Sequence, residues 1–195
     1  MPQKKTILRQ VVSRLPEIIS FCCAALMLCA IPLYFDNAFF NINRCKVGLV
    51  RAAVPWLCVL AAVFWSADRL LNGKTYLEKL IAPDVSLAVF LLACIVSCAI
   101  QGFSEDVMEA ANGRSLGLRL MLCLCAAYYI VALGKMDGRF LTTAMLTCAA
   151  FCAGLGVLNA AGIDPLGFYE NIKKTLKVTF FSTIGNADFF GTYLL

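Results

Sequence analysis

Histidine is absent from the 195-residue sequence, and charged residues are scarce, at 15% of the chain. Without imidazole, the chain cannot build histidine acid–base chemistry, histidine metal ligands or a Ser-His or Cys-His nucleophile pair. The low charge accompanies 61% hydrophobic residues and a mean hydropathy of +0.81. These values are far too apolar for a water-soluble domain, so the composition predicts an integral membrane protein.

Basic residues outnumber acidic ones by 17 to 12, which gives a net charge of +5. They are scattered through short stretches between apolar segments and form no basic face. This distribution excludes nucleic acid as a partner and leaves membrane lipids as the expected surroundings.

Cysteine is plentiful, with eleven residues, yet only Cys45 lies in an expected loop. The others lie inside apolar runs, where spacings such as Cys94/Cys98 and Cys148/Cys152 place both side chains on one helical face. Thiolates need polar, electropositive surroundings, which helices at bilayer depth seldom supply. The cysteines are therefore expected to pack between helices, and the sequence predicts neither a metal site nor a cofactor.

Apolar segments long enough to cross a hydrocarbon layer of roughly 30 Å recur along the chain. Five are complete and a sixth is cut off: residues 18–35, 47–67, 85–103, 116–133, 140–158 and 187–195. The predicted fold class is all-α, a polytopic transmembrane helix bundle that forms a single transmembrane domain over residues 1–195. Because a chain ending inside a span would leave a hydrophobic stub, we expect this to be the N-terminal part of a longer protein.

Lysine and arginine are distributed unevenly between the two sides of this predicted bundle. Nine lie on the side of the N-terminus and six on the other: Lys4, Lys5, Arg9, Arg14, Arg69, Lys74, Lys79, Lys135 and Arg139 against Arg44, Lys46, Arg114, Lys173, Lys174 and Lys177. Since short cytoplasmic segments carry the excess of basic residues, the N-terminus is predicted to be cytoplasmic.

Two arginines, Arg51 and Arg119, lie inside predicted spans near their external ends, and Arg114 lies in the adjoining loop. A charge at the centre of a span costs about 2.5–3.5 kcal/mol, so such residues find a partner, face a polar cavity or snorkel. If the three arginines converge at the outer leaflet, their planar guanidinium groups suit a phosphate or diphosphate. In the alternative interpretation, each snorkels separately to lipid phosphate.

Acidic side chains cluster between the third and fourth spans, at Glu105, Asp106 and Glu109. A solvated acidic turn is the expectation here, and a base that activates a hydroxyl group is the alternative. Two pairs of small residues, Gly113/Gly117 and Ala150/Gly154, have the spacing that brings helices close together, and we expect them to serve helix packing.

Two regions carry a resemblance to a known family. The C-terminal region reads Gly162-Ile-Asp-Pro-Leu-Gly-Phe-Tyr169, then Phe181-Ser-Thr-Ile-Gly-Asn186, then Asp188-Phe-Phe-Gly-Thr-Tyr-Leu194. This pattern resembles the O-antigen ligase and polymerase family of membrane glycosyltransferases, in which a Ser-Thr-x-Gly-Asn loop leads into a helix that opens with aromatic residues. Asn112-Gly-Arg114 with Gly117-Leu118 is similar to a stretch in Gram-positive relatives.

The resemblance implies the N-terminal part of an enzyme that transfers a glycan from a polyprenyl-diphosphate carrier to a hydroxyl acceptor in cell-surface polysaccharide assembly. It implies the cytoplasmic membrane of a bacterium and a polyprenyl-diphosphate-linked glycan as partner. Family members keep catalytic Arg and His residues in a large external loop late in the chain. No catalytic residue is therefore assigned before Leu195, and this part alone is expected to be inactive; the oligomeric state is not predicted.

The predicted substrate-binding residues combine the arginines with the Ser-Thr-x-Gly-Asn loop, whose backbone N–H groups could face an anion: Arg51, Arg114, Arg119, Ser182, Thr183, Gly185 and Asn186. Alternatively, Gly185 and Asn186 only shape the turn and cap the sixth helix. Two other function classes stay open, a transporter or flippase segment and a non-catalytic membrane partner, because polar residues inside spans also mark substrate paths.

Overall fold

The computed structural model of this chain is helical, as the sequence predicts. It describes residues 2–36, 42–74, 81–110, 116–134, 136–169, 177, 179–186 and 191–192. The elements are α1 (Pro2–Ala25), the π-helix η1 (Leu26–Ala30), α2 (Ile31–Leu33), α3 (Ile42–Asn72), α4 (Ala82–Ile100), α5 (Glu105–Glu109), α6 (Leu118–Leu133), α7 (Gly138–Ala160), β1 (Phe180–Phe181) and β2 (Gly185–Asn186). Among the described residues, the only strands are β1 and β2, which form a short antiparallel pair.

Four helical segments in the described part of the chain are long and apolar enough to cross a membrane: Arg9–Leu33, Ile42–Asn72, Ala82–Ile100 and Gly138–Ala160. The helix at the fourth predicted span, α6, has 16 residues. It is about 24 Å long, short of a hydrocarbon layer of roughly 30 Å. The predicted count of five complete spans is therefore not confirmed, and the sixth lies outside the described residues except for Gly191 and Thr192.

The start of α3 corrects one prediction. Arg44, Cys45 and Lys46 were expected in an external loop before a span at 47–67, but the helix already begins at Ile42. Hydropathy marks only the apolar part of a helix, and polar residues at a membrane boundary can continue the helical backbone into the interface. Cys45 is consequently a half-buried helical residue and not a loop thiol.

The chain divides into two compact units, residues 1–24 with 50–137 and residues 25–49 with 138–195. In the first unit, small residues bring α1 against α6. The Ser20 hydroxyl donates to the Ile130 carbonyl over 2.7 Å, and the Cys23 thiol lies 3.7 Å from the Ala127 carbonyl oxygen. A Cβ at Gly134 would collide with the Ser20 hydroxyl, so this close approach requires glycine.

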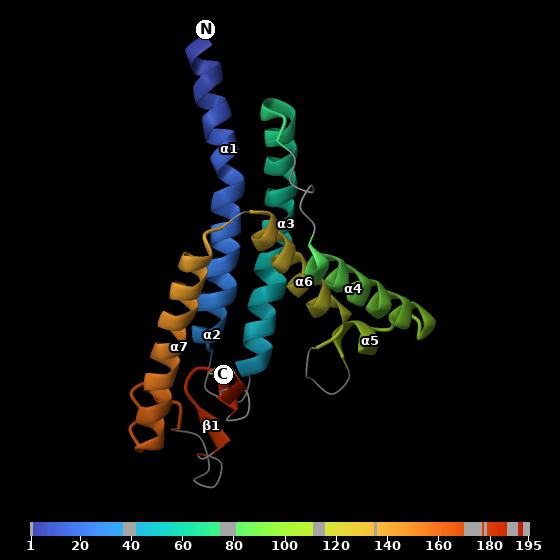
Figure 1. Cartoon of the computed structure of the whole chain (residues 1–195). Coiled ribbons are helices and arrows are strands. Elements are labelled where there is room, and N and C mark those ends of the chain that lie inside the picture. Colours follow the sequence, from blue (N-terminus) through green and yellow to red (C-terminus); the bar gives the residue numbers. More distant parts are fainter. Residues whose placement is uncertain are drawn as a thin grey trace. The chain divides into compact units, whose positions relative to one another are not determined.

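Helices α4 and α6 of the first unit lie side by side (Figure 1) and are tied by Asp84 at the start of α4. The carboxylate accepts hydrogen bonds from the Ile81 N–H and the Tyr128 hydroxyl, both over 2.8 Å. The Tyr129 hydroxyl donates to the Asp84 carbonyl over 2.6 Å. One acidic residue thus caps α4 and binds it to its neighbour.

In the second unit, α7 packs along η1 and α2, and β1 contacts α7 (Figure 1). Ile42, Phe168 and Tyr169 form a small apolar core with Phe180 packed against it. The Tyr169 hydroxyl donates to the Phe180 carbonyl over 2.5 Å. This core holds the hairpin that contains the Ser-Thr-x-Gly-Asn loop.

Candidate functional site

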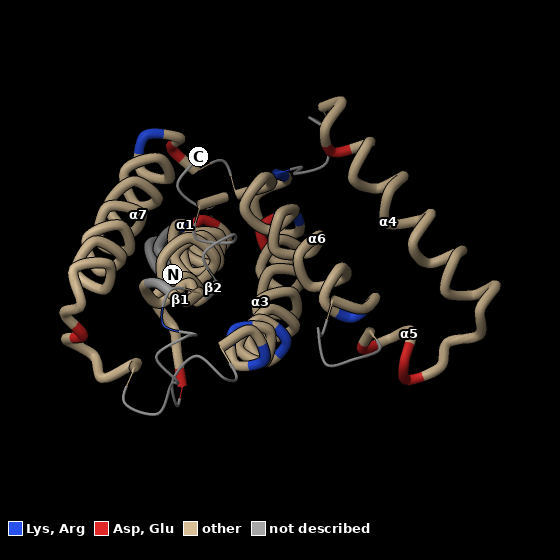
Figure 2. The backbone as a smooth tube through the Cα atoms, turned by 90° about the horizontal axis from the view of Figure 1, so that it is seen from below, with Lys and Arg blue, Asp and Glu red and all other residues tan. Residues whose placement is uncertain are grey.

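Arg51 of α3 and Arg119 of α6 meet at a single carboxylate, that of Glu109 on α5. Arg51 Nη1 donates to Glu109 Oε2 and Arg119 Nη1 donates to Glu109 Oε1, so each oxygen accepts from a different arginine. We call these three residues the arginine–glutamate triad. Figure 2 shows the acidic residues of α5 beside the basic start of α6.

The local backbone explains how Glu109 reaches this position. Helix α5 begins after Ser104, whose carbonyl accepts hydrogen bonds from the N–H groups of Val107 and Met108. The Met108 carbonyl lies where a Cβ would be at position 117, so only glycine allows α5 to approach the start of α6 this closely. Ala110 follows with φ +66°, a left-handed conformation that turns the chain away directly after Glu109.

The triad is partly exposed and carries a net charge of +1. The exposed fractions of the side chains are 22% for Arg51, 30% for Glu109 and 54% for Arg119. The hydrogen bond from Arg51, followed by that from Arg119, lowers the pKa of Glu109 from its ordinary value, although desolvation opposes the shift. Glu109 is therefore an ionised partner at neutral pH and a poor general base.

The structure brings Arg51 and Arg119 together, whereas Arg114 and Gly113 lie outside the described residues. Glu109 is the member that the sequence did not predict, since it was assigned to a solvated acidic turn. Two arginines inside predicted spans need a counter-charge, and that need was the available signal. It did not distinguish Glu109 from Glu105 and Asp106 on the same short segment.

Ser182 and Thr183 form the buried tip of the hairpin in the second unit. The Ser182 N–H donates to Asn159 Oδ1 over 2.9 Å, and the Thr183 hydroxyl donates to the Pro32 carbonyl over 2.8 Å. Cys152 Sγ lies 3.6 Å from the same hydroxyl oxygen. In this structure these two residues therefore connect α7 and the end of α2 and do not line an exposed surface.

Gly185 and Asn186 directly follow the turn at residues 182–184. They form β2, and Gly185 has φ +95°, which favours glycine. The register pairs Phe181 with Gly185 and Phe180 with Asn186. The sixth helix that they were expected to cap lies at residues outside the described part of the chain, apart from Gly191 and Thr192.

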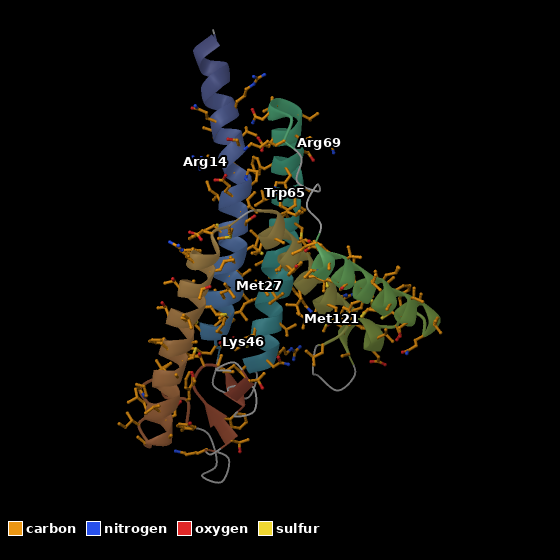
Figure 3. All side chains as sticks on the ribbon, viewed as in Figure 1. Arg14, Met27, Lys46, Trp65, Arg69 and Met121 are labelled. Carbon is orange, nitrogen blue, oxygen red and sulfur yellow. The ribbon has the colours of Figure 1, made fainter. Side chains whose placement is uncertain are left out.

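A further cationic side chain, that of Lys46 near the start of α3, reaches the end of α2. Figure 3 labels it. Its ammonium group donates to the carbonyls of Ile31 and Pro32 over 2.6 and 2.7 Å. These carbonyls end the helical ladder, where a positive charge compensates the helix dipole. The Pro32 carbonyl thus accepts from both Lys46 and Thr183, and Lys46 serves as a helix cap.

The residues that the structure describes contain no group of three or more cysteine or acidic side chains placed to hold a metal ion. The chemical capacity of the site lies in its guanidinium groups, which can bind an anion with several oxygen atoms. Comparisons with protein-family models, with curated proteins and with solved structures find no match to this chain.

Proposed function

We propose that the chain is the N-terminal part of an O-antigen ligase-like membrane glycosyltransferase, which transfers a glycan from a polyprenyl-diphosphate carrier to a hydroxyl acceptor outside the bacterial cytoplasmic membrane. Arg51 and Arg119, joined by Arg114, bind the diphosphate. The leaving group of such a transfer is an anionic lipid diphosphate, so positive charge must be held where that headgroup lies. The family named in this proposal comes from the sequence resemblance at residues 162–194.

The observation that carries the proposal is the meeting of Arg51 and Arg119 from two different helices. Arginines that only snorkel to lipid phosphate have no need of a common point. A diphosphate, in contrast, offers several oxygen atoms to two planar donors at once. The triad keeps a net positive charge after Glu109 is counted, which favours the binding of an anion.

Lipid binding tests the proposal directly. The purified chain in detergent is titrated with undecaprenyl diphosphate, with phosphatidylglycerol as competitor, and bound lipid is counted by native mass spectrometry. We expect Arg51→Gln and Arg119→Gln each to weaken diphosphate binding about tenfold or more, because each removes a charged hydrogen-bond donor. Phosphatidylglycerol should compete poorly, since its single phosphate offers fewer oxygen atoms.

Arg69→Gln is the matched control. Arg69 is an exposed arginine toward the opposite end of α3, where Figure 3 labels it. It lies roughly 27 Å along the helix axis from Arg51. Its loss should leave diphosphate binding unchanged. Equal binding by the Arg51, Arg119 and Arg69 variants, or equal binding of phosphatidylglycerol, would remove the diphosphate role.

In a longer protein that contains this chain, Arg51→Ala or Arg119→Ala should abolish glycan transfer without loss of membrane insertion. Transfer is measured with a carrier-linked radiolabelled glycan, and insertion by the amount of protein that resists carbonate extraction. Full transfer activity in both variants would contradict the proposed function.

A further inference from the structure

The anion position between Arg51 and Arg119 is occupied by a side chain of the protein itself. The two oxygens of Glu109 accept one hydrogen bond from each arginine. A phosphoryl group would use the same guanidinium donors, in the same two-sided arrangement. The carboxylate and an external anion therefore compete for one place.

Helix α5, which carries Glu109, is a short element. It has five residues, none of them buried. Its Met108 carbonyl rests against Gly117, and its own N–H groups bond back to Ser104. Ala110 holds a left-handed backbone conformation, which costs free energy in a residue other than glycine. Besides the backbone contact with Gly117, the ion pairs of Glu109 join α5 to α3 and α6.

From this geometry we propose that Glu109 is a built-in competitor of the diphosphate, and that anion binding releases Glu109 together with α5. The inference rests on the proposed function and adds a conformational step to it. If the site binds ligand only when Glu109 has left, its apparent affinity equals its intrinsic affinity multiplied by the fraction of molecules in which the site is open. Linkage also requires that a ligand which displaces Glu109 raises the open fraction of α5 by the same factor.

The experiment removes the competing charge and keeps the shape. Glu109→Gln is compared with Asp106→Asn, a matched acid-to-amide change at an exposed position of the same helix. With undecaprenyl diphosphate as probe, we expect Glu109→Gln to bind about threefold more tightly or better, and Asp106→Asn to bind as the wild type does. Inorganic pyrophosphate is titrated in parallel as the free form of the same headgroup.

Hydrogen–deuterium exchange over residues 104–110 supplies a readout that does not depend on the affinity of the variant. In the wild type, undecaprenyl diphosphate should accelerate exchange at Val107 and Met108, whose N–H groups are bonded within α5. In Glu109→Gln, exchange should be fast before lipid is added. Slower or unchanged exchange in the wild type on lipid binding would overturn the inference.

The outcomes separate the two proposals. If binding depends on the arginines but is no tighter in Glu109→Gln than in the wild type, the competitor role is overturned and the diphosphate site is kept. Tighter binding of pyrophosphate by Glu109→Gln, with no binding of the lipid, supports the competitor role and overturns the polyprenyl carrier. Absence of arginine-dependent binding in both the wild type and Glu109→Gln overturns both proposals.

Discussion

At the scale of single residues, protonation of Glu109 controls the arginine–glutamate triad. The hydrogen bond from Arg51, with that from Arg119, lowers the pKa of Glu109 below its ordinary value of 4.5. A group whose pKa is lower in the folded protein stabilises that state above the unfolded pKa, and this stabilisation disappears as pH falls through the folded value. The triad therefore stabilises the fold at neutral pH and not in strong acid.

We accordingly predict a pH-dependent difference in melting temperature between the wild type and Glu109→Gln in detergent. The wild type should melt higher at pH 7, and the gap should shrink below about pH 4 and close once the carboxylate is protonated. Asp106→Asn should show no comparable gap at neutral pH. A gap for Glu109→Gln that stays constant from pH 7 to pH 3 would mean that the carboxylate charge is not what stabilises the triad.

Thr183 permits a second test at this scale. Its buried hydroxyl donates to the Pro32 carbonyl and ties the hairpin to the end of α2. Thr183→Val keeps the volume and removes the donor, and should cost about 1 kcal/mol in unfolding free energy, the usual net value of one hydrogen bond. Thr183→Ser keeps the hydroxyl and should cost less. A higher melting temperature for Thr183→Val than for Thr183→Ser would exclude this role.

At the scale of elements, the approach of α1 to α6 depends on one glycine. Gly134 has an ordinary helical backbone, φ −74° and ψ −5°, so an alanine there meets no backbone penalty. Its Cβ would nevertheless overlap the Ser20 hydroxyl. We predict that Gly134→Ala destabilises the protein by about 1–3 kcal/mol, the usual cost of overpacking.

Gly154→Ala on α7 is the matched control, because a Cβ there meets nothing within 4 Å. It should be neutral or slightly stabilising. The Ser20→Gly change removes the atoms that the new methyl group would meet, so Gly134→Ala should cost less in that background than alone. Unfolding free energies from a chemical denaturation series measure this coupling, and strict additivity would show that the two residues do not meet.

These glycines also show what the sequence could predict about the elements. Small-residue spacing indicated close packing at Gly117 and at Gly154. At Gly117 the backbone of α5 fills the space, whereas at Gly154 a Cβ would lie in open space. Spacing along a helix defines a face but does not say which neighbour covers it. Gly134 does not belong to either spacing. Its partner Ser20 is more than a hundred residues away in the sequence, so no local pattern indicates their contact.

At the scale of the whole molecule, hydropathy predicted a helix at each of the five segments, because apolar length is what a bilayer selects. It missed the polar start of α3 at Ile42, since hydropathy does not report backbone conformation. The alternation of spans placed Arg51 and Arg119 at matching ends of their helices. Glu109 could not be foreseen because its position depends on how the short α5 folds back onto Gly117.

The sidedness of the chain remains the prediction on which an external glycosyl transfer depends. The two ends of α4 test it, because Ala82 and Gln101 are both exposed and about 28 Å apart along one helix. We predict that an impermeant maleimide labels Gln101→Cys in intact cells, and labels Ala82→Cys only after permeabilisation. Each variant is compared with the wild type, whose eleven native thiols set the background.

The physical reason is the excess of basic residues on the side of Ala82, which short cytoplasmic segments retain. Since Gln101 precedes α5 by only a few residues, labelling from outside would place the arginine–glutamate triad at the outer leaflet, where a carrier lipid presents its diphosphate for transfer. The reverse pattern, Ala82→Cys labelled in intact cells and Gln101→Cys protected, would put the triad on the cytoplasmic side. The guanidinium groups could then bind a lipid phosphate but could not serve a transfer that takes place outside.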